Sequence, residues 1–338
     1  MKEGNYIKLN GYLASITTIL SFFGTFAIII SFFAWKDIRT ASRRILVYIS
    51  AADFLTSVAT ITAMASFWIN GKETKEVCSV QSILGTFSVL ASFFWTVFLA
   101  LYLYIAICRK NVFLAQRLLL PFHVCGWGIP AVIVSGAFFG KKLGNNDNKV
   151  TSGWCWINED LNWPDQVLWM LLAGKLWEIM AYFTIVVLYA LVKRSMKKGR
   201  AGLLTCNDVT QAQKVERKLI CIPLIFVLLR MWGTIRFFLL VAKGPEYQSS
   251  DLLLILQGIG DNAPGFANFL LFFLFTEKCL GNFRLWITCS STCFSRNNHC
   301  PSSSTVFRDA SQEPLVQHNE INNKNNPSLQ DSKNYLAI

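Results

Sequence analysis

Residues 78–108, CSVQSILGTFSVLASFFWTVFLALYLYIAIC, decide the fold, because they run for 31 residues without a charged side chain. A helix needs about 20 apolar residues to cross the hydrocarbon core of a bilayer. The composition of the whole chain agrees, since 53% of its 338 residues are hydrophobic and only 15% are charged. An ordinary soluble domain carries roughly 25% charged residues. A water-soluble globular protein is therefore excluded.

Six further apolar runs with little or no charge lie on either side of this stretch. Together they make seven predicted spans, at residues 11–35, 45–69, 78–108, 118–139, 167–192, 219–242 and 252–275. The expected fold is an all-α membrane protein, a seven-transmembrane helix bundle over residues 11–275. Three flanking segments complete the predicted organisation: an N-terminal tail at 1–10, an amphipathic interfacial helix at 276–289, and a disordered polar tail at 290–338.

Lys and Arg in the connecting segments predict the orientation. Segments on one side of the spans hold 17 of these residues, and segments on the other side hold 8. Because positively charged segments stay in the cytosol, we expect the N-terminus outside and the tail inside, in the plasma membrane or, as an alternative, the ciliary membrane. The net charge of +12 is then largely a topology signal. No basic face of a soluble fold is present, so we expect no nucleic-acid partner.

Two of the ten cysteines fall on the predicted outer side. Cys78 begins the third span, and Cys155 lies in the loop between the fourth and fifth spans. The exterior is oxidising and offers no competing cysteine, which predicts a disulfide between them. Three cysteines near the interfacial helix are candidates for acylation or are free thiols: Cys279, Cys289 and Cys293.

Ionisable side chains occur inside the predicted spans: Asp53, Lys175, Glu178, Arg230, Arg236 and Asp261. Each costs at least about 2.5 kcal/mol at the bilayer centre, so such groups face the bundle interior or pair with one another. A helical rise of about 1.5 Å per residue puts Glu178 and Arg230 at similar depths, where they can meet. Lys175, Glu178 and Tyr182 share a helix face through their spacing of three and four residues.

Two interpretations of these groups remain open. In the first, Tyr182 and all of the charges except Asp53 line a pocket that opens outward. Three basic groups then face two acidic ones, and the surplus positive charge favours a small anionic ligand, such as a carboxylate. In the second, the charges form ion pairs that hold the helices together and bind nothing. Asp53 lies nearer the inner end and is more typical of a switch or a sodium site.

The third span resembles that of the secretin-like G-protein-coupled receptors. Residues 92–104 read SFFWTVFLALYLY, similar to their NFFWLLVEGLYLH, with Leu99 in place of Glu and Tyr104 in place of His. Residues 221–224 read CIPL, similar to their LIPL, and residues 264–266 read PGF where theirs read QGF. The resemblance covers roughly residues 11–289.

Other segments define the position within this receptor class. Residues 153–157 and 168–178 are similar to an orphan receptor of the class and, more distantly, to the cyclic-AMP receptor-like branch. The outer tail of about ten residues is far shorter than the hormone-binding domain of a secretin-type receptor. A peptide hormone held by such a domain is therefore not expected.

The resemblance implies a receptor that transmits an extracellular small-ligand signal to a heterotrimeric G protein. Phosphoinositide and calcium output is favoured, with the choice among Gq, Gs and Gi open. Arrestin is a further implied partner, through tail hydroxyls at 302–305, and membrane lipids would contact the basic inner segments. The cations expected to face the G protein are Arg109, Lys110, Lys193, Arg194, Arg217 and Lys218.

The expected switch involves three residues. We predict that the inner half of the sixth span swings outward about Pro223, because proline removes a backbone hydrogen bond. Asp53 resembles the second-span Asp of rhodopsin-like receptors, and Asn268 could face it from the seventh span. Residues 105–110 read IAICRK and contain no Asp-Arg-Tyr. The inactive state would then be held through Arg109 or through a contact between the second and seventh spans.

The main alternative is a seven-helix membrane transporter or channel. Carriers of this size contain two three-helix repeats, and we find no similarity between the first three spans and the last three. A retinal pump would need a lysine in the seventh span, and residues 252–275 contain none. An enzyme is not expected, since no metal-ligand cluster or nucleophile with its base is evident. We expect no cofactor and no metal.

Overall fold

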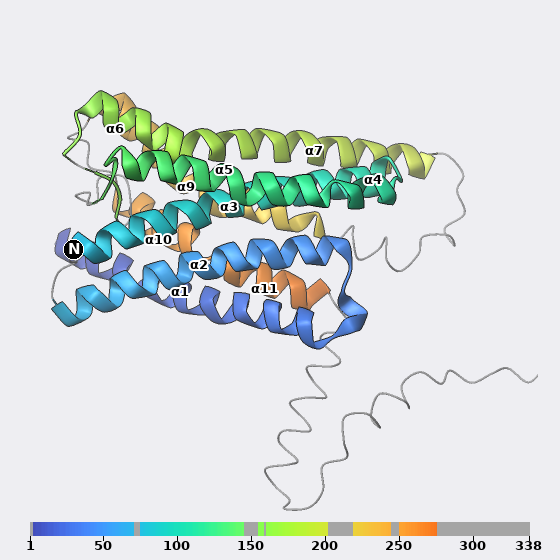
Figure 1. Ribbon diagram of the computed structural model, residues 1–338, viewed down its shortest axis with the longest axis horizontal. Helices are drawn as coiled ribbons and strands as arrows, with labels where there is room; N and C mark the ends of the chain where they lie inside the picture. Colours follow the sequence, from blue (N-terminus) through green and yellow to red (C-terminus); the bar gives the residue numbers. More distant parts are fainter. Residues whose placement is uncertain are drawn as a thin grey trace, which may run out of the picture. The chain divides into compact units, whose positions relative to one another are not determined.

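A computed structural model describes residues 3–70, 75–144, 155–158, 160–201, 219–244 and 250–275. All of them belong to one compact unit, Met1–Arg284. The long helices run alongside one another as a bundle (Figure 1). The predicted interfacial helix at 276–289, the tail at 290–338 and the cations Arg217 and Lys218 lie outside the described residues.

Six helical segments in the described part are long and apolar enough to cross a membrane. The first four are α1 (Glu3–Ala34), α2 (Ala41–Asn70), α3 (Lys75–Cys108), and α4 (Val112–Arg117) with α5 (Leu119–Phe139). The last two are a continuous rod of α6 (Trp163–Met170), the π-helix η2 (Leu171–Lys175) and α7 (Leu176–Ala201), and the helix α9 (Cys221–Lys243). A 3-10 turn, η1 (Lys36–Ile38), joins α1 to α2. The first helix begins inside the stretch that we assigned to an N-terminal tail.

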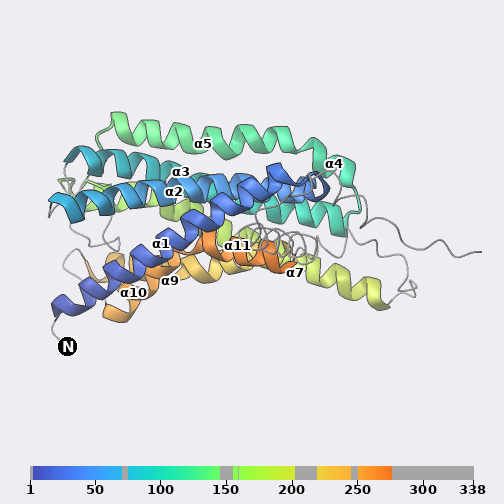
Figure 2. The same ribbon diagram turned by 90° about the horizontal axis from the view of Figure 1, so that it is seen from below.

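The seventh predicted span consists of two helices. The helices α10 (Asp251–Asn262) and α11 (Pro264–Phe275) meet at Ala263 and follow one another alongside α1 (Figures 1 and 2). Pro264 has no backbone N–H to donate to the carbonyl of Gly260, four residues earlier, so the helix is interrupted. The predicted span at residues 252–275 is thus helical, with an interruption at Ala263 that the apolar run did not reveal.

Ser21 of α1 supports this interruption. Its hydroxyl donates to the backbone carbonyl of Asn262 and accepts a hydrogen bond from the N–H of Phe266 at 3.1 Å. Small residues make the close approach possible, since a Cβ added at Gly265 would lie 2.6 Å from Cγ2 of Thr25. Small residues at helix contacts are a common device of membrane bundles, because they let two backbones come close together.

The helix α3 lies at the centre of the bundle. It packs against α2, α5, α7 and α9, and its Phe93, Trp95 and Tyr102 are fully buried. The outer faces of other helices are also apolar, and Phe139 of α5 and Phe183 of α7 are exposed there. Exposed apolar surface on this scale is typical of contact with a membrane. The chain is a multi-pass membrane protein whose core and exterior are both apolar.

Cys78 and Cys155 form a disulfide, with their Cα atoms 5.4 Å apart, which confirms the predicted pairing. Next to it, two short strands, β1 (Leu143–Gly144) and β2 (Trp156–Ile157), pair antiparallel. This small sheet is the one addition to the predicted all-α fold in the described part of the chain. We call this end of the bundle the disulfide end. We call the opposite end, where α3 ends before Arg109 and Lys110, the basic end.

Replacing both Cys78 and Cys155 with serine is expected to lower the free energy of unfolding by about 2–5 kcal/mol, because the bond restricts the unfolded chain. The measurement is the midpoint of thermal unfolding of the purified protein in nanodiscs. The matched control is Cys125→Ser, at a free cysteine of α5. A double variant as stable as this control would contradict the prediction.

Candidate functional site

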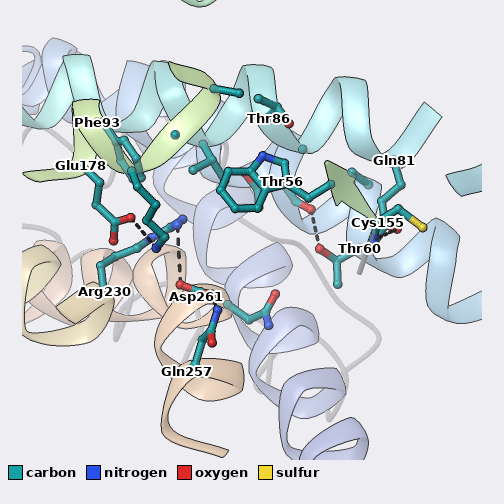
Figure 3. Close-up of a pocket in the computed structure, with 18 residues that line it drawn as sticks. Thr56, Thr60, Gln81, Thr86, Phe93, Cys155, Glu178, Arg230, Gln257 and Asp261 are labelled. Carbon is teal, nitrogen blue, oxygen red and sulfur yellow. Dashed lines mark hydrogen bonds and ion pairs between the residues drawn. The ribbon is translucent and has the colours of Figure 1, made fainter. Parts of the chain in front are cut away.

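A cavity of about 100 Å³ lies near the disulfide end of the bundle. Side chains of α2, α3, η2, α7, α9 and α10 line it, and Cys155 and Trp156 of the loop form part of its wall (Figure 3). Pockets for drug-sized ligands are usually about 300–1,000 Å³. The cavity therefore suits a molecule of few atoms.

The π-helix η2 forms the side of the cavity that carries Lys175. A π-turn contains more residues than an α-turn and is frequent at functional sites. Gly174 lies in this turn, where an added Cβ would be 2.7 Å from Cζ2 of Trp156. Glycine thus allows the loop that the disulfide holds to pack directly against η2.

Glu178 accepts two hydrogen bonds from its own helical rod. Lys175 donates from Nζ to Oε2 at 2.7 Å, and Tyr182 donates from its hydroxyl to Oε1 at 2.5 Å. The same Tyr182 hydroxyl lies 3.3 Å from Oγ1 of Thr234 on α9. The predicted shared face of Lys175, Glu178 and Tyr182 is present, and both oxygens of the Glu178 carboxylate are engaged.

Arg230 of α9 pairs with Asp261 of α10, at 3.6 Å between Nη1 and Oδ1. Asp261 also accepts a hydrogen bond from Nε2 of Gln257 at 3.1 Å. Figure 3 shows Glu178, Arg230 and Asp261 directed toward the same space. No ion pair joins Glu178 to Arg230 within the part of the chain that the structure describes. The two residues line the same cavity, as their similar depth predicts, but the direct partner of the Glu178 carboxylate is Lys175, one turn away.

Two of the predicted pocket residues, Arg236 and Tyr182, do not line the cavity. Arg236 donates from Nη1 to the side-chain oxygen of Gln257, which does line the cavity. Among the described lining residues, Lys175 and Arg230 are balanced by Glu178 and Asp261. The one positive charge that we predicted in excess of the acidic groups is that of Arg236, which does not line the cavity.

Sequence reasoning missed the uncharged polar side chains of the cavity. Gln257 lies four residues before Asp261 on the same face of α10, and this spacing could have identified it. Thr56, Gln81 and Thr86 carry no comparable signal, because hydroxyl groups in helices often bond to their own backbone. Only the packing of α2, α3 and the loop shows that they share one cavity.

A second polar cluster surrounds Asp53. Ser92 donates to Oδ1 of Asp53 at 2.7 Å, and Asn268 donates from Nδ2 to Oδ2 at 3.1 Å. This contact joins α2, α3 and α11. Arg109 is exposed and has no ion pair among the described residues. Two ways of holding the inactive state were expected, one through Arg109 and one through a contact between the second and seventh spans. The structure contains the second contact, the hydrogen bond from Asn268 to Asp53.

Pro223 is the third residue of α9, whose N-cap is Ile220. Leu219, four residues before Pro223, is also helical, and Ile220 is a turn between them with helical dihedral angles. Proline has no N–H to donate to the Leu219 carbonyl, which is consistent with this local break. The hinge at Pro223 stays a prediction. Four of the predicted partner-facing cations are exposed at the ends of α3 and α7: Arg109, Lys110, Lys193 and Arg194.

Comparison with known proteins identifies relatives of this chain. The sequence model of the 7 transmembrane receptor (Secretin family) matches residues 5–257. G-protein coupled receptor 157 of Homo sapiens is 37% identical over 271 residues, 78% of this chain and 79% of that protein. The protein of the same name from Mus musculus is 36% identical over 272 residues, 78% and 81% of the two chains.

A solved structure shares the fold. The crystal structure of squid rhodopsin superposes with a TM-score of 0.64 at 15% sequence identity, over 94% of each chain. At this identity the likeness concerns the arrangement of the helices alone.

Proposed function

The chain belongs to the secretin family of seven-transmembrane receptors, and we propose that it passes a signal from a small extracellular ligand to a heterotrimeric G protein. The observation that carries the proposal is the polar cavity near the disulfide end. Its wall combines α3, η2, α7, α9 and α10. A ligand there would contact α3, α7 and α9, which also reach the basic end. 

Ligand binding and G-protein coupling can therefore involve the same helices. A ligand shifts an equilibrium between two conformations only by its difference in affinity for them. The contact between Arg230 and Asp261 joins α9 to α10 inside the cavity. In the proposed mechanism, the ligand changes this contact, and α9 moves relative to the seventh span.

The proposed orientation has the disulfide end outside the cell and the basic end in the cytosol. A disulfide between Cys78 and Cys155 suits an oxidising compartment. The excess of Lys and Arg in the segments on the other side supports the same orientation. The plasma membrane is the location that we propose.

The basic end would form the surface that contacts the G protein. Replacing Arg109 and Lys110 together with glutamine is expected to slow nucleotide exchange by roughly fivefold, and by less at high salt, because exposed charge pairs are weak and screened. The measurement is nucleotide exchange on purified G proteins of several subtypes, with the receptor in nanodiscs.

The matched control replaces Lys141 and Lys243, two exposed lysines at the disulfide end, with glutamine. Equal exchange by both double variants would contradict the assignment of the surface. The alternative function, a transporter or channel, is tested with the same protein in proteoliposomes. Solute flux without any nucleotide exchange would overturn the proposed receptor function.

A further inference from the structure

Arg230 has hydrogen-bonding capacity that the described residues do not use. It is only 7% exposed, and a guanidinium has five N–H donors. Its ion pair to Asp261 is 3.6 Å long, beyond hydrogen-bonding distance, and its Nε has no partner. The ring of Phe93 covers one face of the group, 5.0 Å from Cζ. A buried donor without a partner is costly, so an acceptor brought by a ligand would be stabilised.

The carboxylates of the cavity are already engaged. Glu178 accepts from Lys175 and Tyr182, and Asp261 accepts from Gln257 and faces Arg230. The Lys175 ammonium has three donors, of which one goes to Glu178. A ligand that brings acceptors therefore finds partners, whereas a ligand ammonium would compete with two buried cations for the same carboxylates.

Thr86 is a second polar group without a partner in this cavity. Its Oγ1 is buried and has no hydrogen bond. Thr86 and Phe93 lie seven residues apart on α3, so Thr86 is about 10 Å nearer the disulfide end than the ring that covers Arg230. Val89 lines the wall between them. The cavity thus has Arg230 at one part and the Thr86 hydroxyl toward the disulfide end, with Val89 of α3 and Thr56 of α2 between them. Figure 3 shows Thr86, Thr56 and Arg230.

Size and charge limit the ligand further. A volume of about 100 Å³ is well below the roughly 300–1,000 Å³ of pockets for drug-sized ligands, which favours a ligand of few heavy atoms over a peptide or a membrane lipid. The four charged lining residues already balance, so a monoanion adds a single charge. A phosphate dianion would add two negative charges to a buried site whose charges already balance, at a higher desolvation cost.

We propose that the cavity binds a small monocarboxylate with a short apolar chain. Arg230 and Lys175 hold the carboxylate, because a guanidinium matches its two oxygens, and the chain extends along Val89 toward Thr86. This inference deepens the proposed receptor function by naming the chemical class of its ligand. Binding itself requires no G protein and is tested separately from coupling.

The test measures binding of butanoate, hexanoate and octanoate to the purified full-length receptor in nanodiscs, by calorimetry and by the thermal unfolding midpoint. Hexanoate is expected to bind and to raise the midpoint, while hexanamide, equal in shape but neutral, is expected to do neither. Equal protection by hexanamide, by chloride or by inorganic phosphate would overturn the inference. Absence of binding by every carboxylate would overturn it as well.

Arg230→Lys keeps the charge but loses the planar pair of donors. It is expected to weaken hexanoate binding by at least about tenfold, as the loss of charge-assisted hydrogen bonds implies. The matched control is Arg43→Lys, at a buried arginine of α2 that does not line the cavity and donates to the backbone carbonyl of Ile38. Equal binding by the two variants would refute the role of Arg230.

Thr86→Val keeps the side-chain shape and removes the hydroxyl, so it tests the proposal even if the arginine variant does not fold. The native receptor is expected to prefer 6-hydroxyhexanoate to hexanoate, and the variant to lose this preference. A preference that survives in the variant would show that the chain does not reach Thr86, contrary to the proposal.

Nucleotide exchange separates the two proposals. Hexanoate that binds without changing exchange would support the ligand class and contradict the proposed coupling. Receptor-stimulated exchange with no carboxylate binding would support coupling and overturn the ligand class.

Discussion

Replacing Gly260 with alanine is expected to prevent the receptor from folding correctly. A Cβ at this position would lie 2.0 Å from the carbonyl oxygen of Leu229 and 3.0 Å from its carbon. These are backbone atoms, which cannot rotate away as a side chain can, so α9 and α10 would have to separate. Overpacking of this kind costs about 1–3 kcal/mol or more. The separation would also disturb the adjacent contact between Arg230 and Asp261.

The measurement for Gly260→Ala is the fraction of monodisperse protein after purification, together with its thermal unfolding midpoint. The matched control is Gly128→Ala in α5, where nothing lies within 4 Å of the added Cβ. Alanine is also the better helix former there, so the control should be at least as stable as the native protein. If Gly260→Ala equals the control, the close approach of α9 and α10 is wrong.

Glu178→Ala is expected to destabilise the bundle by about 3–5 kcal/mol, because it leaves one partner of a buried ion pair without compensation. Lys175 would lose its hydrogen bond of 2.7 Å, and the Tyr182 hydroxyl would lose its acceptor. Both losses occur in the rod formed by α6, η2 and α7. The measurement is the free energy of unfolding in a defined lipid or detergent.

The matched control for Glu178→Ala is the double variant Lys175→Met with Glu178→Leu. It removes both charges, and replacing a buried pair with apolar groups is often neutral or stabilising. We expect it to regain most of the lost stability while it binds hexanoate less tightly than the native receptor. A double variant no more stable than Glu178→Ala would show that the buried charge is not the cause of the loss.

The positions of the spans could be predicted because lipid imposes a length and a composition on each segment. Six of the seven predicted runs correspond to the long apolar helices of the bundle. The interruption at Ala263 was missed, because an apolar run has the same composition with or without a break. Pro264 was its signal, and the hydroxyl of Ser21, far away in the sequence, helps to hold it.

For the ionisable residues inside the spans, the sequence predicted burial but not the ion-pair partners. Their burial followed from the cost of an ionisable group in the membrane, and Lys175, Glu178 and Arg230 are buried. Their partners did not follow from helical depth. Depth specifies a position along the bilayer normal, whereas an ion pair also depends on how each helix is rotated about its axis. Glu178 therefore pairs with Lys175, and Arg230 with Asp261.

The sequence by itself determined the membrane class, the number of spans, the disulfide and the receptor family, because each depends on local composition, on the side of the membrane or on short strings. Tertiary structure alone decided which polar groups share a cavity. Thr86, Gln257 and Trp156 come from α3, α10 and β2, and only the packing of these distant elements brings them together. The physical reason is that helix rotation and close backbone approach are set by contacts between spans, which no single segment encodes.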